Sequence, residues 1–107
     1  RNRVMDLNNE ITFQTGQIVK ILKGRDAGQY AVIVSIEDSR FVWIADGDKR
    51  KFDGAKKKNV LHLEPLSIIS SEVVNSLQES GRVTNGKLRF ALSRFVSDKS
   101  KANQKGD

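Results

Sequence analysis

The segment that most constrains the fold is 15–34, TGQIVKILKGRDAGQYAVIV, in which a short charged loop separates two apolar runs. The runs at 18–22 and 30–36 are rich in isoleucine and valine, as β-strands are. Two glycines bracket the charged residues, and glycine adopts a positive φ at little cost. The segment therefore predicts two strands joined by a tight connection, here called the glycine loop (residues 23–28), whose charged tip is held out from the sheet.

The strand pattern continues in short steps beyond this hairpin. Three further strands are predicted, at 40–45, 49–52 and 59–63, and the turn signals between them are acidic residues and glycine. Five short strands within about 50 residues favour a small closed barrel over an open sheet. The predicted fold is therefore mainly β, with a five-stranded barrel at 14–66, and Pro65 is expected to end the β part.

Downstream of the predicted barrel, the spacing of apolar residues changes from that of strands to that of helices. Ser70 is the predicted N-cap of a first helix, and Gly81 supplies its C-terminal stop. A second helix is predicted to open at Thr84 or Asn85, because apolar residues then recur at i, i+3, i+4 and i+7. Neither helix is long enough to be stable alone, so we expect this C-terminal helical pair, 67–97, to pack on the barrel or on each other.

Charge and composition favour a polyanionic partner. Lys and Arg outnumber Asp and Glu by 19 to 13 in a chain of 107 residues, and such a basic surplus favours nucleic-acid binding. The absence of cysteine excludes disulfides and thiolate metal sites. No apolar run approaches the ~18 residues of a membrane span and no signal peptide is visible, so a cytoplasmic protein is expected. Polar residues dominate 1–13, predicted to be flexible, and 98–107, predicted to be a disordered tail.

Two basic segments are candidate phosphate-binding sites. The glycine loop carries Arg25, whose guanidinium can clamp a phosphate or stack on a base, and its glycines allow close approach of the backbone. The lysine run (residues 56–58) is predicted to lie in a loop, where its side chains can contact phosphates. The alternatives are a solvated hairpin and a strand edge protected by charge. The candidate residues are Lys23, Gly24, Arg25, Gly28, Lys49, Lys51, Lys56, Lys57 and Lys58.

Two features limit how many charges can act on one ligand. In the fourth predicted strand, alternation places Lys49 and Lys51 on one face and Arg50 on the other. Asp26 puts a negative charge inside the glycine loop, where we interpret it as orienting Arg25 or capping the turn. The six basic residues of 49–58 therefore cannot all face one ligand, whereas the lysine run and Arg25 are expected to act together on one phosphate path.

Aromatic residues offer a second mode of contact. Phe41 and Trp43 share one face of the third predicted strand, and Val42 and Ile44 share the other. If the aliphatic pair fills the barrel, the two rings can form a stacking platform for unpaired bases. The alternative is that both rings cover the core beneath the C-terminal helices.

Catalysis finds no support in the sequence. No phosphate-binding loop, dinucleotide fingerprint or nucleophile elbow is present. His62 is the single histidine in a chain without cysteine, so no zinc site is expected. We therefore expect a non-enzymatic protein without metal or cofactor.

Gly16 is followed along the chain by an apolar strand, a basic tip, Gly28 and a Val/Ile-rich strand. This order resembles the KOW motif, an element of small SH3-like barrels. The segments 41–47 and 56–63 look like those of bacterial KOW-domain RNA-binding proteins. Those proteins are related to archaeal and eukaryotic large-subunit ribosomal proteins. The segment 81–85 also resembles the start of the last helix in that family.

The resemblance covers about 15–95 and implies a five-stranded SH3-like barrel followed by two short α-helices. It also implies that the chain binds RNA through the glycine loop and the lysine run, on or near the ribosome and in translation. The implied partners are structured ribosomal RNA or the ribosome, with a ribosomal or transcription protein as a further candidate; no membrane is implied, and a monomer is expected. Ala55 stands where the family commonly has proline, which leaves the segment before the lysine run less constrained.

Two other functional classes remain open. KOW barrels of elongation factors also bind proteins, and an apolar groove between barrel and helices would favour a protein-interaction module. Residues 70–95 could instead form a helix-turn-helix that binds DNA. In that case Lys87, Arg89 and Arg94 would be the contacts available on the second helix.

Overall fold

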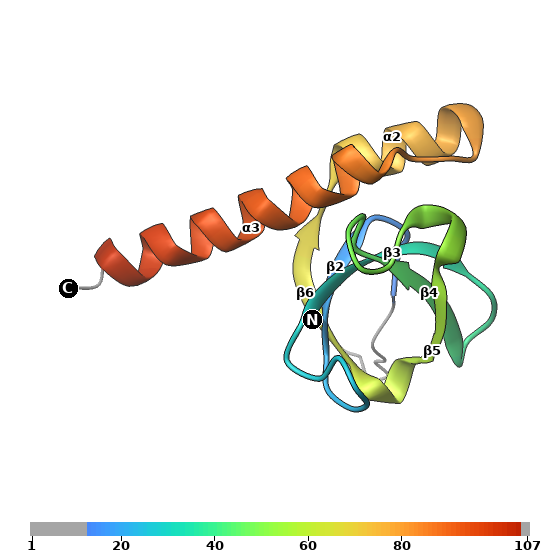
Figure 1. The fold of residues 1–107 in the computed structure, drawn as a ribbon, viewed down its shortest axis with the longest axis horizontal. Coiled ribbons are helices and arrows are strands. Elements are labelled where there is room, and N and C mark those ends of the chain that lie inside the picture. Colours follow the sequence, from blue (N-terminus) through green and yellow to red (C-terminus); the bar gives the residue numbers. More distant parts are fainter. Residues whose placement is uncertain (1–12, 106–107) are drawn as a thin grey trace, which may run out of the picture.

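Five strands pair antiparallel into one curved sheet, in the order β5-β4-β3-β2-β6, in the computed structural model, which describes residues 13–105 (Figure 1). Two α-helices follow the sheet in the chain. The elements are β2 (Gln17–Ile21), β3 (Tyr30–Ile36), β4 (Phe41–Ala45), the 3-10 turn η1 (Phe52–Gly54), β5 (Lys56–Asn59), the 3-10 turn η2 (Val60–His62), β6 (Leu63–Ile69), α2 (Ser71–Ser80) and α3 (Asn85–Lys105).

The sheet is not closed. Its edge strands, β5 and β6, are consecutive in the chain, but no pairing joins them in the described part of the chain. The turn η2 between them bonds to other segments instead: Val60 N donates to Arg40 O at 2.8 Å, and Leu22 N donates to His62 O at 2.8 Å. The predicted strand-rich fold with two C-terminal helices is confirmed, whereas the closed barrel is not confirmed.

The prediction of a strand at 49–52 is wrong, because backbone groups of these residues form hydrogen bonds within a turn and with a helix. Asp46 N donates to Arg50 O at 2.8 Å, and Asp46 Oδ1 accepts from Arg50 N at 2.9 Å. Phe52 N donates to Asn85 Oδ1, 2.7 Å away at the start of α3. The amides that would pair with a neighbouring strand therefore close the Asp46–Arg50 turn and contact a helix.

Three further expectations about strands are also wrong. No single strand covers 59–63, because Val60–His62 form the 3-10 turn η2 between β5 and β6. The lysine run is not a loop, because it forms most of β5 and pairs with β4, Lys57 lying opposite Trp43. Pro65 does not end the β part, because it lies within β6, opposite Val19. Proline is tolerated there because β6 is an edge strand, so one side of its backbone has no partner strand.

Apolar residues pack on both faces of the sheet, since alternate residues of a strand point to opposite sides. Val42 and Ile44 are buried in a cluster made by strands alone. Trp43 points the other way and packs, partly buried, against the cluster that the helices cover. Its position supports the covered-core alternative over a free stacking platform. The helix-covered cluster comprises Ile18, Val32, Val34, Ala45, Val73, Val83, Leu88 and Ala91.

Capping residues begin and end α2. Ser70 Oγ accepts from Val73 N at 3.3 Å at the start of α2. Gly81 ends α2 with a φ of 76°, in the left-handed conformation that favours glycine. The start of α3 at Asn85 is also as predicted. The helix-covered cluster contains residues of both helices, so the pair is held against the sheet by apolar burial.

The last helix is longer than the sequence predicts. α3 runs to Lys105, so the backbone is helical over most of 98–107, where a disordered tail was expected. Figure 1 shows its C-terminal turns extending past β6, away from the sheet. The predicted flexible segment 1–13 lies outside the described residues except for Phe13, which packs against the strand-only cluster. No helix in the described residues is long and apolar enough to cross a membrane.

Gly47 allows α3 to approach the Asp46–Arg50 turn closely. It is buried, its φ is 81°, and its carbonyl accepts a hydrogen bond from Arg89 Nη1 at 2.7 Å. A Cβ at this position would overlap the carbonyl oxygen of Asn85 and lie 3.0 Å from Leu88 Cβ. Both the backbone conformation and the available space therefore require glycine.

Candidate nucleic-acid interface

The glycine loop closes directly on the ends of β2 and β3. Gly28 N donates to Ile21 O at 2.7 Å, and Ile21 N donates to Gln29 O at 2.8 Å. Gly24 and Gly28 have φ values of 101° and 92°, in the left-handed region. The hydrogen bonds hold the base of the loop, while Arg25 at its tip is exposed to solvent.

Replacing Gly28 by alanine is expected to lower the free energy of unfolding by about 1–2 kcal/mol, the cost of holding an L-residue at positive φ. A Cβ at Gly28 meets nothing within 4 Å, so the cost comes from the backbone alone. Gly54→Ala is the matched control, because Gly54 has the same free space without a positive φ. Chemical denaturation of both variants measures the difference, and equal stabilities would show that the loop conformation is not the constraint.

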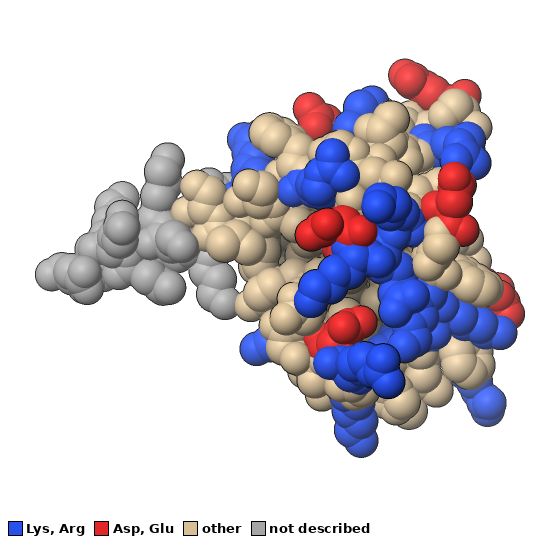
Figure 2. All heavy atoms as spheres, viewed as in Figure 1, with Lys and Arg blue, Asp and Glu red and all other residues tan. Residues whose placement is uncertain are grey.

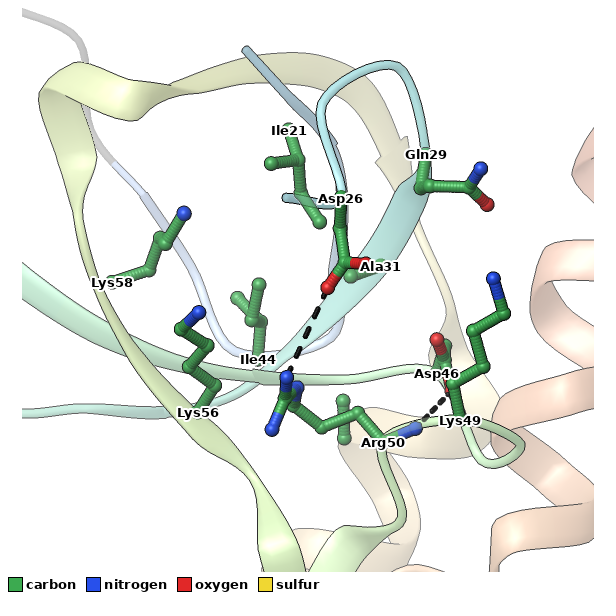
Figure 3. A pocket seen from close by; sticks show the side chains of 11 residues that line it. Ile21, Asp26, Gln29, Ala31, Ile44, Asp46, Lys49, Arg50, Lys56 and Lys58 are labelled. Atoms are coloured by element: carbon green, nitrogen blue, oxygen red, sulfur yellow. Dashed lines mark hydrogen bonds and ion pairs between the residues drawn. The ribbon is translucent and has the colours of Figure 1, made fainter. Parts of the chain in front are cut away.

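The strand conformation of the lysine run divides its side chains between the two faces of the sheet. Figure 3 shows Lys56 and Lys58 pointing into a small cavity that also faces the glycine loop. Lys58 is only 9% exposed, and its Nζ donates to Lys23 O at 2.9 Å. Lys58 therefore anchors the glycine loop to β5, a structural role that its place in the sequence does not reveal.

Lys57 points to the opposite face, where other groups of the protein hold its ammonium. Its Nζ lies 2.8 Å from Glu37 Oε2 and 4.8 Å from the centre of the Phe41 ring. The hydrogen bond from Lys57, followed by that from Trp43 Nε1, lowers the pKa of Glu37, and the same contact with Glu37 raises the pKa of Lys57. Lys57 is therefore separated from the other predicted phosphate contacts.

The cavity beside the glycine loop, here called the basic cavity, gathers charges from three segments. Its charged lining residues are Asp26 of the glycine loop, Asp46, Lys49 and Arg50 of the Asp46–Arg50 turn, and Lys56 and Lys58 of β5. The cavity measures about 20 Å³, which is room for about one water molecule and not for a substrate. A larger ligand must therefore bind over the rim of the cavity.

Arg50 is the residue that the sequence reasoning missed. Its Nη2 lies 3.8 Å from Asp26 Oδ2 and links the Asp46–Arg50 turn to the glycine loop. The alternation of side chains along a predicted strand places Arg50 on the face opposite Lys49 and Lys51. Arg50 lies in a turn, however, and side chains do not alternate in that way there. The sequence predicts that Asp26 orients Arg25 or caps the turn, and in the structure its ion pair is with Arg50 instead.

The structure brings some of the predicted residues together and separates others. Lys49, Lys56 and Lys58 border the basic cavity with Arg50. Lys51 is exposed but does not line the cavity. Figure 2 shows lysine and arginine side chains gathered over one part of the molecular surface, with isolated carboxylates among them. This surface can attract phosphates without reading base sequence.

The helix-turn-helix alternative loses two of its three candidate contacts. Lys87 Nζ donates to Ser76 Oγ at 2.8 Å, and Arg89 donates to Gly47 O. These side chains hold α3 against α2 and against the Asp46–Arg50 turn. Among the described residues, no group of three or more His, Cys, Asp or Glu side chains could hold a metal ion.

Comparison with known proteins finds related sequences with ribosomal names. Residues 15–44 match the KOW motif family. The chain is 54% identical over 44 residues to "Putative ribosome-binding protein YbzG" of Bacillus subtilis, an alignment that spans 41% of this chain and 60% of that protein. It is 41% identical over 89 residues to large ribosomal subunit protein eL14 of Saccharolobus islandicus, spanning 74% of this chain and 91% of eL14. The eL14 of Sulfolobus acidocaldarius is 32% identical over 78 residues, which cover 64% of this chain and 79% of that protein.

Proposed function

The chain belongs to the KOW-motif family that includes archaeal ribosomal protein eL14, and from this premise we propose that it is a non-catalytic RNA-binding protein of the ribosome. Its relatives carry the names of ribosomal and ribosome-binding proteins. The proposed role is in translation, in the cytoplasm, with structured ribosomal RNA as the partner of a monomeric chain. The curved sheet is, in this proposal, the SH3-like barrel of the family, with its open seam between β5 and β6.

The observation that carries the proposal is the convergence of the glycine loop with the basic cavity. Arg25 is exposed at the tip of the loop, and Lys49 and Lys56 border the cavity next to it. Cations held by rigid strands and a hydrogen-bonded turn can neutralise successive phosphates along one backbone. Gly24 and Gly28 lack side chains, which permits close approach of the RNA backbone.

The protein is expected to bind structured RNA with a steep dependence on salt. If about four phosphates are neutralised, log K should fall against log[salt] with a slope of about −3 to −4, because counterions are released on binding. Filter binding of purified large-subunit ribosomal RNA between 50 and 200 mM salt measures the slope, with a DNA duplex as competitor. An affinity that does not change with salt would contradict the electrostatic contact.

One observation favours a protein-interaction module as the second candidate function. A groove between β6, α2 and α3 is bordered by apolar side chains, and Ile68, Ile69 and Phe90 are exposed there by 40%, 42% and 52%. Exposed apolar clusters of this kind are typical of protein contacts. If Phe90→Ser abolished ribosome association while leaving the affinity for purified RNA unchanged, the protein contact would be the main function.

A further inference from the structure

Asp26 and Arg50 face each other across the rim of the basic cavity (Figure 3). Their closest charged atoms are 3.8 Å apart, and no hydrogen bond joins the two side chains in the described structure. The Arg50 and Asp26 side chains are 37% and 34% exposed, so solvent screens the pair. Such a pair contributes little to stability and is easily exchanged for another partner.

The carboxylates on either side of Arg50 have different roles. Asp46 Oδ1 accepts from Asp48 N at 2.8 Å and from Arg50 N at 2.9 Å, so Asp46 shapes the turn. The Asp26 carboxylate has Arg50 as its ion-pair partner and makes no such bond to the backbone among the described residues. Asp26 therefore places one negative charge beside Arg50, where the other cations that line the cavity are Lys49, Lys56 and Lys58.

We propose that Arg50 is a phosphate-binding residue, and that Asp26 is its counter-ion in the free protein, which a phosphodiester of RNA replaces on binding. A phosphate fits this exchange because it accepts two guanidinium hydrogen bonds at once, whereas Asp26 is too far away to accept one. The neighbouring lysines favour a second anion at the same place. This inference rests on the proposed RNA-binding function and adds one binding residue and one opposing residue to it.

Asp26→Asn should raise the affinity for large-subunit ribosomal RNA about three- to fivefold, the effect of removing one screened charge about 5 Å from a phosphate. The near-isosteric amide should leave the melting temperature unchanged. Asp48→Asn is the matched control, because it removes the same charge from an exposed residue two positions before Arg50. An equal gain with Asp48→Asn would show a general charge effect and overturn the role of Asp26, as would a loss of affinity with Asp26→Asn.

The role of Arg50 is tested with Asp26 already neutralised. In the Asp26→Asn background, Arg50→Gln should lower RNA affinity about five- to tenfold and make the salt slope shallower by about one, the loss of one phosphate contact. If Arg50 serves only to neutralise Asp26, Arg50→Gln has no effect in this background, and the proposal is wrong. Absence of salt-dependent RNA binding by the unmodified protein would overturn the proposed function itself, and this inference with it.

Discussion

Replacing Gly47 by alanine is expected to lower the free energy of unfolding by about 2–5 kcal/mol, because two separate costs add. A residue with a Cβ held at positive φ costs about 1–2 kcal/mol, and overpacking of a close contact costs about 1–3 kcal/mol. The contact at risk is between the Asp46–Arg50 turn and the first turn of α3, where the new Cβ would overlap the carbonyl oxygen of Asn85. A total stability of about 5–15 kcal/mol is usual for small domains, so this loss is large.

Gly86→Ala is the control for this prediction. Gly86 lies in the first turn of the same helix, but it has no positive φ and a Cβ there meets only ordinary contacts at 3.8 and 4.0 Å. Alanine favours a helix over glycine by about 0.8–1 kcal/mol, so this variant should be slightly more stable than the parent. Urea denaturation should show a lower free energy of unfolding for Gly47→Ala and a slightly higher one for Gly86→Ala than for the parent. If Gly47→Ala were as stable as the parent, the observed docking of α3 would be incorrect.

The variant Arg25→Ala/Lys56→Ala should lower RNA affinity about 25- to 100-fold near 100 mM salt, because each lost phosphate contact weakens binding about five- to tenfold. The two residues lie on the glycine loop and on β5, so they test whether the two elements act on one ligand. The salt slope should become shallower by about two. Melting temperature should change little, since loosely held charges on the surface contribute little to stability.

The matched control removes two other positive charges. Lys57 and Arg82 are paired with Glu37 and Asp53, at 2.8 and 2.6 Å respectively. Lys57→Ala/Arg82→Ala changes the net charge by the same amount, yet it should lower RNA affinity less than about threefold, because only the long-range field changes. Filter binding of all variants to the same RNA gives the comparison. Equal losses for the two pairs would show that RNA responds to net charge rather than to this surface.

Local sequence signals predicted the elements whose cause is local. The two glycines of the glycine loop have the positive φ that a tight connection needs. Ser70 and Gly81 begin and end α2 because capping depends on neighbouring backbone groups. The apolar spacing after Asn85 identified the face of α3 that is buried against the sheet, including Leu88 and Ala91.

The candidate site was predicted in part, because the sequence lists charges but not the surfaces they share. The lysine run was correctly singled out as basic, yet its strand conformation sends Lys57 to one face and Lys58 into contact with the Lys23 carbonyl. Arg50 was placed away from the site by a strand rule that its turn does not obey. Whether a residue lies in a strand or a turn depends on the hydrogen-bond partners of its backbone, and that conformation sets the direction of its side chain. Many of these partners are distant in the sequence.

By itself, the sequence determined a strand-rich chain with two capped helices, a glycine loop and a basic surplus, because periodicity, glycine and charge act over a few residues. The tertiary structure alone decided that β6 continues through Pro65 at an edge and that the sheet is not closed. It also decided that α3 packs against Gly47 and that Asp26 forms an ion pair with Arg50. Both contacts join segments that are distant in the chain. The physical reason is that such contacts depend on how curved strands and packed helices bring remote residues together, which no local pattern records.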